Sequence, residues 1–281
     1  MYYVGKFDES RFAVPHGYAG NSRGYERADL VDHGVGSVHM GAGICQLQPQ
    51  GDVESRIHAN EKGIYVLEGE LEIKRGQDVF RLSADDYALI PYGTPHALRN
   101  TGTKPARWFE MQAPQPKPQG GWQDTFFTGD NAWPAQVSAP DFANAATKSV
   151  GRFKPQNPMA PKGEGTSGLS VYRFMEQKFG AQGFFMMRGE LSAGGARSRH
   201  DHTVEEFYFA LSGEAFMDIE SERFHLRRWD VAWTAVGASH AFYHTGDVTF
   251  RWIETQAPQF PAKNGTRDYA DWDKLRTDPS P

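Results

Sequence analysis

The sequence contains a single cysteine, Cys45, among 281 residues. It can therefore form no internal disulfide bond and no thiolate cluster around a metal, which fits a protein of the reducing cytoplasm. No stretch approaches the ~18 consecutive apolar residues that a membrane span needs. The first residues, MYYVGKFDESRF, also lack a basic segment followed by an apolar one. We therefore expect a cytoplasmic protein with neither a membrane span nor a secretory signal.

The chain also has no excess of positive charge. Lys and Arg together number 30 against 35 Asp and Glu, so the net charge is −5. Proteins that bind nucleic acid or anionic membranes carry a basic surface, and we expect neither partner here. By contrast, the chain has 30 glycines, 17 prolines and 13% aromatic residues. This composition is typical of many short strands joined by turns.

The chain repeats itself. Trp108–Gln115 (WFEMQAPQ) returns as Trp252–Gln259 (WIETQAPQ), 144 residues later. Between Leu47 and Gln115 the same offset holds without an insertion or deletion. The residues that match at this offset include Leu47 with Leu191, His58 with His202, Gly69 with Gly213, Asp86 with Asp230, Gly93 with Gly237, and His96 with His240. Such a repeat indicates a tandem duplication.

Each copy has the pattern of β-strands. Gly63–Arg75 and Glu206–Glu220 are rich in β-branched and aromatic residues and are interrupted by glycine. We therefore predict an all-β protein with two barrels, formed by residues 1–135 and 136–281. One helical turn is expected within 140–153, and the last residues, from Asp268 onward, are expected to form a short helix or tail.

One segment of the second copy, Gly194–Gly213 (GGARSRHDHTVEEFYFALSG), points to metal chemistry. His200 and His202 are two residues apart, so on a strand they point to the same side and can reach one ion. A straight strand would carry the following carboxylates away, so a turn must bring one of them back. Strand parity favours Glu206 for this role, and Glu205 is the alternative.

A third imidazole follows in the same copy. Gly237 permits a bend that presents His240 to the inside of the barrel. Three imidazoles and one carboxylate suit Fe(II), Mn(II), Ni(II), Cu(II) or Zn(II), whereas Ca(II) and Mg(II) prefer oxygen ligands. The sequence thus predicts one divalent transition metal per chain, with ligands His200, His202, Glu206 and His240.

These residues resemble the two conserved motifs of the cupin family, and the chain as a whole resembles a bicupin over about residues 45–115 and 185–260. The first motif is complete in the second copy. The second motif departs from the family pattern at three positions of the second copy: Ala235 replaces Pro, Trp229 replaces Gly, and His244 replaces Asn. The resemblance implies two tandem cupin barrels, of the jelly-roll or double-stranded β-helix type, with the metal in the second.

The first copy has lost two of the four ligands. At the equivalent positions stand Arg56, His58, Lys62 and His96. Two cations would repel a divalent ion at close range, although Glu61 in a shifted register could support a weak site. The simplest interpretation is a barrel with a structural role. The alternative is that these four residues form a small anion pocket.

The repeated Trp-Glu-Gln strand raises the question of which face points inward. Alternation places Phe109 and Met111 of the first copy, and Ile253 of the second, on one face. Because these are apolar, we expect them to point into the barrels. The repeated Trp, Glu and Gln would then face outward, where two barrels or two subunits of a homodimer meet. The opposite assignment would make Glu254 line the metal pocket.

Four further residues are candidates for the pocket. Tyr208 shares the face of the predicted carboxylate ligand and could donate a proton, or simply pack in the core. Phe242 and His244 share the face of the third imidazole, and His244 could orient a ligand. Arg188, if it points inward, would suit a substrate carboxylate.

The resemblance and the predicted site together favour a metal enzyme acting on a small molecule. The main hypothesis is an Fe(II) dioxygenase whose substrate binds through a carboxylate, enolate or phenolate. A non-redox hydrolase, lyase or isomerase, similar to ureidoglycine aminohydrolase, is the alternative. The sequence departs from that family, which has Glu at the position of His200 and Gln at that of His240. A non-catalytic binding bicupin is the third hypothesis.

Overall fold

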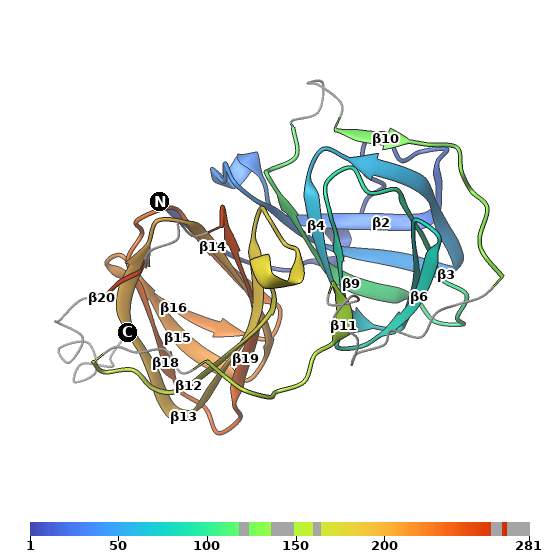
Figure 1. Ribbon diagram of the computed structural model, residues 1–281. Helices are drawn as coiled ribbons and strands as arrows, with labels where there is room; N and C mark the ends of the chain where they lie inside the picture. Colours follow the sequence, from blue (N-terminus) through green and yellow to red (C-terminus); the bar gives the residue numbers. More distant parts are fainter. Residues whose placement is uncertain (118–123, 136–148, 160–163, 260–265, 269–281) are drawn as a thin grey trace.

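The computed structural model describes residues 1–117, 124–135, 149–159, 164–259 and 266–268. Two ten-stranded sheets form two barrels that lie side by side (Figure 1). The prediction of an all-β protein with two barrels is confirmed. The predicted helical segments lie mostly outside the described residues. Within them, residues 150–152 are a strand and Asp268 ends another.

The strands of the two barrels correspond one to one. Those of the first barrel are β2 (Ser22–Val31), β3 (Gly41–His58), β4 (Glu61–Glu68), β5 (Glu70–Arg75), β6 (Asp78–Ser83), β7 (Asp86–Ile90), β8 (His96–Arg99), β9 (Ala106–Ala113) and β10 (Thr125–Phe127). Those of the second barrel are β12 (Ser167–Met175), β13 (Phe185–His202), β14 (Glu205–Ser212), β15 (Glu214–Ile219), β16 (Glu222–Arg227), β17 (Asp230–Thr234), β18 (His240–His244), β19 (Phe250–Ala257) and β20 (Thr266–Asp268). The order β7-β4-β9-β3-β8-β5-β6 recurs as β17-β14-β19-β13-β18-β15-β16.

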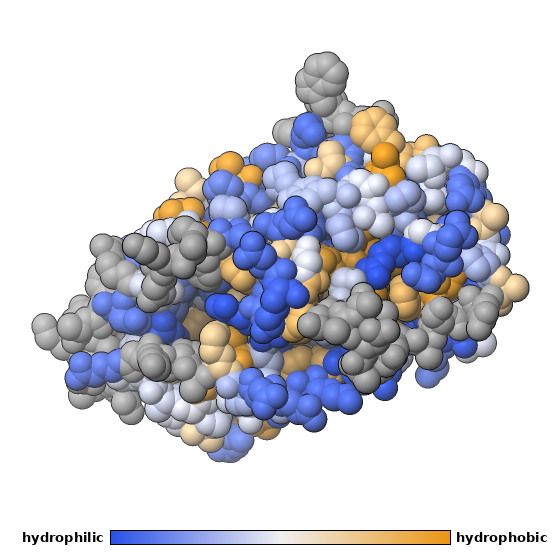
Figure 2. All heavy atoms as spheres, in the orientation of Figure 1, coloured by the Kyte–Doolittle hydropathy of each residue, from blue (hydrophilic) through white to orange (hydrophobic). Residues whose placement is uncertain are grey.

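The remaining regular elements are short. They include three 3-10 turns, at Glu9–Arg11, His33–Val35 and Gln177–Phe179. In the described part of the chain, none of the helices has the length and hydropathy that crossing a membrane requires. The face of the molecule in Figure 2 mixes hydrophilic and hydrophobic residues.

Two strands are exchanged between the barrels. β1 (Tyr2–Lys6), near the start of the chain, pairs with β17 of the second barrel. β11 (Val150–Arg152), which follows the first barrel, pairs with β7 of that barrel. The exchanged strands carry the related sequences VGKF and VGRF, and Lys6 pairs with Asp230 as Arg152 pairs with Asp86. The division at residue 135 stays a prediction. Each of these two strands pairs with a strand on the other side of that division.

A large apolar core lies between the barrels. Phe109 of β9 is fully buried there and stacks on Phe207 and Phe209 of β14, with ring centroids 5.6 and 6.0 Å apart. Met111 and Ile253 belong to the same cluster. The prediction that these three apolar residues point into the barrels is therefore wrong. Both faces of β9 and β19 are buried, one inside a barrel and one against the other barrel, so an apolar face does not identify the interior.

The repeated Trp-Glu-Gln face is the one that points inward. Trp108 and Trp252 lie in the two interior cores. Gln256 donates a hydrogen bond to Glu254 at 2.9 Å and another to Glu206. Glu254 therefore lies at the predicted metal ligands, as the opposite assignment proposed.

Two buried carboxylates link the barrels reciprocally. Glu205 accepts hydrogen bonds from the hydroxyl of Ser37 at 2.6 Å and the backbone of Val38 at 2.8 Å, both in the first half of the chain. Glu61 accepts from the backbone of Gln182 at 3.0 Å and Gly183 at 2.8 Å, in the second half. Both carboxylates hold a loop of the other barrel. Glu205 is thus not the alternative metal ligand, and Glu61 does not reach the first barrel's pocket.

Candidate metal centre

The four predicted ligands meet inside the second barrel. His200 and His202 lie at the end of β13, Glu206 is the second residue of β14 after a two-residue turn, and His240 begins β18 opposite His200. One ligand atom of each residue lies within 4.8 Å of those of the others. All four side chains are buried. The cluster could hold a metal ion.

Hydrogen bonds set the orientation of the imidazoles. Nδ1 of His200 donates to the carbonyl of Ser198 at 2.8 Å, and Nδ1 of His240 donates to that of Ala238 at 2.9 Å. A ring that carries its proton on Nδ1 keeps a lone pair on Nε2, which is the form that binds a metal. Burial lowers the pKa of His200 well below its usual value, so its ring stays neutral. The donor set therefore fits a divalent transition metal.

The carboxylate stands at the centre of the cluster. One oxygen of Glu206, Oε2, lies 3.1 Å from Nε2 of His202 and 2.9 Å from Nε2 of His240. Burial opposes its charge, but these imidazoles hold the pKa of Glu206 well below the usual range. Burial and the nearby Glu206 raise the pKa of Glu254, which also accepts a hydrogen bond from the indole of Trp252 at 2.9 Å. One carboxylate is thus ionised beside a neutral one.

Tyr208 and Phe242 pack beside the metal cluster. The hydroxyl of Tyr208 lies 3.0 Å from Nε2 of His240. Burial, and then the negative charge of Glu206, raise the pKa of Tyr208 well above its usual value, so the phenol keeps its proton. The ring of Phe242 packs against Tyr208 at 4.9 Å and stacks on Trp252 at 5.5 Å. The site combines one proton donor with apolar walls.

Arg197 is a candidate that sequence alternation does not indicate. It is three residues from His200, so a regular strand would place the two on opposite faces. A register shift between them puts Arg197 opposite Phe242 and His200 opposite His240, on the same side. The guanidinium pairs with Asp268 at 2.9 Å, and its charge contributes to the lowered pKa of His200. A buried cation therefore lies close to the metal cluster.

Two other expectations are wrong. Arg188 does not face the metal pocket, because its guanidinium lies between the barrels, 3.3 Å from the Tyr65 hydroxyl and 3.4 Å from Asp85. His244 orients no metal ligand. Its Nε2 donates to the carbonyl of Val248 at 2.8 Å, which corresponds to one of the bonds that Asn100 makes in the first barrel.

The first barrel keeps the hydrogen bonds that orient the imidazoles, and one of them now holds a replacement residue. Nδ1 of His96 bonds the carbonyl of Thr94 at 2.9 Å, and Nδ1 of His58 bonds the hydroxyl of Thr125 at 2.8 Å. Arg56 donates to the carbonyl of Glu54 at 3.2 Å, the counterpart of the carbonyl that holds His200. Among the described residues, the only group of His, Cys, Asp or Glu that could hold a metal is the one in the second barrel.

Comparison with known proteins agrees with this architecture. The model of the cupin domain family matches residues 43–111 and again residues 187–255. The chain is 31% identical over 104 residues to the tetracenomycin polyketide synthase protein TcmJ of Streptomyces glaucescens, 70% of whose length is covered.

The chain belongs to the cupin family.

With two matches in one chain it is a bicupin. It is also 33% identical over 93 residues to the polyketide synthase protein CurC of Streptomyces cyaneus. These stretches are 32% and 36% of the bicupin, and they cover 60% of CurC.

Two solved structures share the fold of the bicupin. Oxalate decarboxylase of Lactobacillus farciminis, in complex with formate, has a TM-score of 0.69 at 15% identity and covers 98% of this chain and 90% of its own. Salicylate 1,2-dioxygenase of Pseudaminobacter salicylatoxidans has a TM-score of 0.64 at 16% identity, with 84% and 77% covered. At these identities the likeness establishes the fold.

Proposed function

We propose that this bicupin is a metal-dependent enzyme that oxidises a small organic acid, enol or phenol with dioxygen. The observation that carries the proposal is the convergence of His200, His202, Glu206 and His240 in a buried barrel interior. When bound, an Fe(II) ion would supply Lewis acidity and electrons for dioxygen activation. Mn(II), Ni(II), Cu(II) and Zn(II) suit the same donors.

The surrounding side chains divide the remaining tasks. Arg197, next to the cluster, would bind the carboxylate of the substrate and fix its orientation. Tyr208 holds a proton at its hydroxyl, 3.0 Å from His240, and would give it to a basic atom of the substrate. Phe242 and Trp252 exclude water from the pocket.

The similar proteins support a substrate of this kind. Two proteins of the same fold are named for oxalate and salicylate, which are small carboxylates. Two relatives are named for polyketide synthases, and polyketides carry enol and phenol groups. Each is compatible with a substrate that binds through a carboxylate, enolate or phenolate.

A non-redox hydrolase, lyase or isomerase is the second candidate. The position of Tyr208 favours it, because reactions of these classes need a proton donor beside a Lewis acid rather than dioxygen. A non-catalytic binding protein would need neither a proton donor nor dioxygen.

The experiment that separates these functions starts with metal-stripped protein. It is reloaded with Fe(II), Mn(II) or Zn(II) and incubated with small carboxylates and phenols, in air and without oxygen. Oxygen uptake only with Fe(II) and substrate supports the dioxygenase. Turnover without oxygen, with Mn(II) or Zn(II), overturns it in favour of the non-redox enzyme. Failure to bind any of the three metals overturns the metal centre itself.

A further inference from the structure

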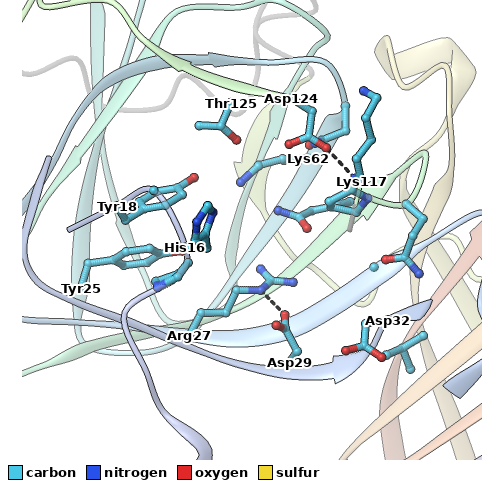
Figure 3. A pocket seen from close by; sticks show the side chains of 18 of the residues that line it. His16, Tyr18, Tyr25, Arg27, Asp29, Asp32, Lys62, Lys117, Asp124 and Thr125 are labelled. Carbon is cyan, nitrogen blue, oxygen red and sulfur yellow. Dashed lines mark hydrogen bonds and ion pairs between the residues drawn. The ribbon is translucent and has the colours of Figure 1, made fainter. Parts of the chain in front are cut away.

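A cavity lies in the first barrel (Figure 3). Its volume is about 300 Å³, at the small end of ligand-binding cavities. Lys62, Gln112 and Thr125 line it, and they correspond to Glu206, Gln256 and Thr266 around the metal cluster. The first barrel has therefore kept a ligand-sized space where the second has its metal pocket.

Two of the cations in this cavity share one buried carboxylate. Glu110 accepts from Arg27 at 2.7 Å and from Lys62 at 3.1 Å. Burial opposes the charge of Glu110, but Lys62 and then Arg27 lower its pKa to about 2. Arg27 also pairs with Asp29 at 2.6 Å, at the half-exposed rim. These two cations are thus balanced by two carboxylates.

Arg56 has no such balance. Its side chain is 1% exposed, and its Nη1 donates to the carbonyl of Glu54, a neutral group. Among the described residues, Nε has no hydrogen-bond partner, and Glu110 forms its ion pairs with Arg27 and Lys62. Arg56 is not itself a lining residue, but its guanidinium lies 5.7 Å from the ring of Tyr18, which lines the cavity. A buried unpaired cation is costly, and a bound anion would offset that cost.

Neighbouring groups are also left unsatisfied. Within the part of the chain that the structure describes, Nε2 of His58 and of His96 are buried without a hydrogen-bond partner, and the two rings lie 4.9 Å apart. Oδ1 of Asn60, on the cavity wall, is likewise unpartnered. A barrel with only a structural role gains nothing from three unmatched polar side chains.

One wall of the cavity is aromatic. Tyr18 packs against Tyr25 at 5.3 Å and against Phe127 at 5.4 Å, and all three line the cavity. Such a surface binds the ring or hydrocarbon part of an organic molecule. An aromatic wall favours an organic anion over inorganic phosphate, which has no apolar part to place against it.

We propose that the first barrel is a second, metal-free binding site for a small organic carboxylate. The carboxylate binds Arg56 and Lys62, and its apolar body lies against Tyr18, Tyr25 and Phe127. The two barrels then bind acids by different means, one through a metal and the other through a guanidinium. This proposal does not depend on the reaction proposed for the second barrel.

The test uses benzoate as the probe, with benzamide as its neutral counterpart and inorganic phosphate as the competing anion. Binding is measured by isothermal titration calorimetry on the full chain, before and after removal of metal with a chelator. We expect one benzoate site to survive chelation, and benzamide and phosphate to bind at least about tenfold more weakly. Equal binding of benzamide, or tighter binding of phosphate, would overturn the proposal.

Substitutions assign the site to the first barrel. Arg56→Gln should weaken benzoate binding at least about tenfold in chelated protein, because it removes a charge-assisted bond. The matched control is Arg75→Gln, since Arg75 donates to Leu89 and Ser149 and its guanidinium lies over Phe80 rather than over Tyr18. Unchanged benzoate affinity in Arg56→Gln refutes the assignment. Should Arg56→Gln fail to fold, Tyr18→Leu decides, with a larger expected loss for benzoate than for acetate; equal losses would count against the aromatic wall.

Discussion

The core between the barrels gives the sharpest structural prediction. Phe109 is fully buried and stacks nearly parallel on Phe207 of the other half, with an interplanar angle of 4°. Phe109→Ala removes a buried aromatic ring and leaves a cavity, which typically costs about 3–5 kcal/mol. We expect urea denaturation to show a loss of about 4 kcal/mol. Phe126→Ala, on β10 of the same barrel and 48% exposed, is the control and should cost under about 0.5 kcal/mol.

Removing a ring buried inside a barrel would also destabilise the protein, so the loss of stability alone does not show that Phe109 lies between the barrels. A double-mutant cycle with Phe207 tests this location. Phe207→Ala, made alone and combined with Phe109→Ala, should reveal a coupling energy of about 1 kcal/mol between the two rings. Both probes, far-ultraviolet circular dichroism and tryptophan fluorescence, should report one transition. Strictly additive effects would mean that the rings do not meet, and the interface described here would be wrong.

Three further predictions concern the sites. The double change His200→Ala with His202→Ala should lower bound metal from near one per chain to near zero, by elemental analysis, with the circular dichroism spectrum retained. Tyr208→Phe should keep the metal but reduce kcat by about 10²–10⁴-fold, measured on the substrate that the screen finds. Burial lowers the pKa of His58 and of His96, so the folded state binds fewer protons than the unfolded state below pH ~6.5. Stability should therefore fall by up to about 1 kcal/mol per histidine from pH 6.5 to 5.5, and urea midpoints independent of pH would contradict this.

The barrels and the positions of the metal candidates were predictable because they depend on local spacing. His200 and His202 share a face by alternation, and a turn must return the chain before Glu206 because a straight strand would carry it away. The repeat identified His240, because it matches His96 at the 144-residue offset. These features need no knowledge of what packs around each barrel.

The errors share one cause, which is that alternation does not say what covers each face. The face with Phe109 is apolar because another barrel covers it. Arg188 would suit the pocket only if it pointed inward, and it does not, because its strand also borders the first barrel. Arg197 was missed because a β-bulge reverses the parity between it and His200. Neither a bulge nor an interdomain contact leaves a mark in strand periodicity.

The exchange of β1 and β11 has a consequence for the integrity of the molecule. With the chain divided at the predicted boundary, residue 135, each part supplies an edge strand to the sheet of the other, so neither part alone contains all the strands of its sheet. If the halves were produced as separate fragments, each would display a bare strand edge on β7 or β17 whose hydrogen-bonding groups match the missing piece. The fragments would be mutually complementary, and reassembly of one would require the presence of the other.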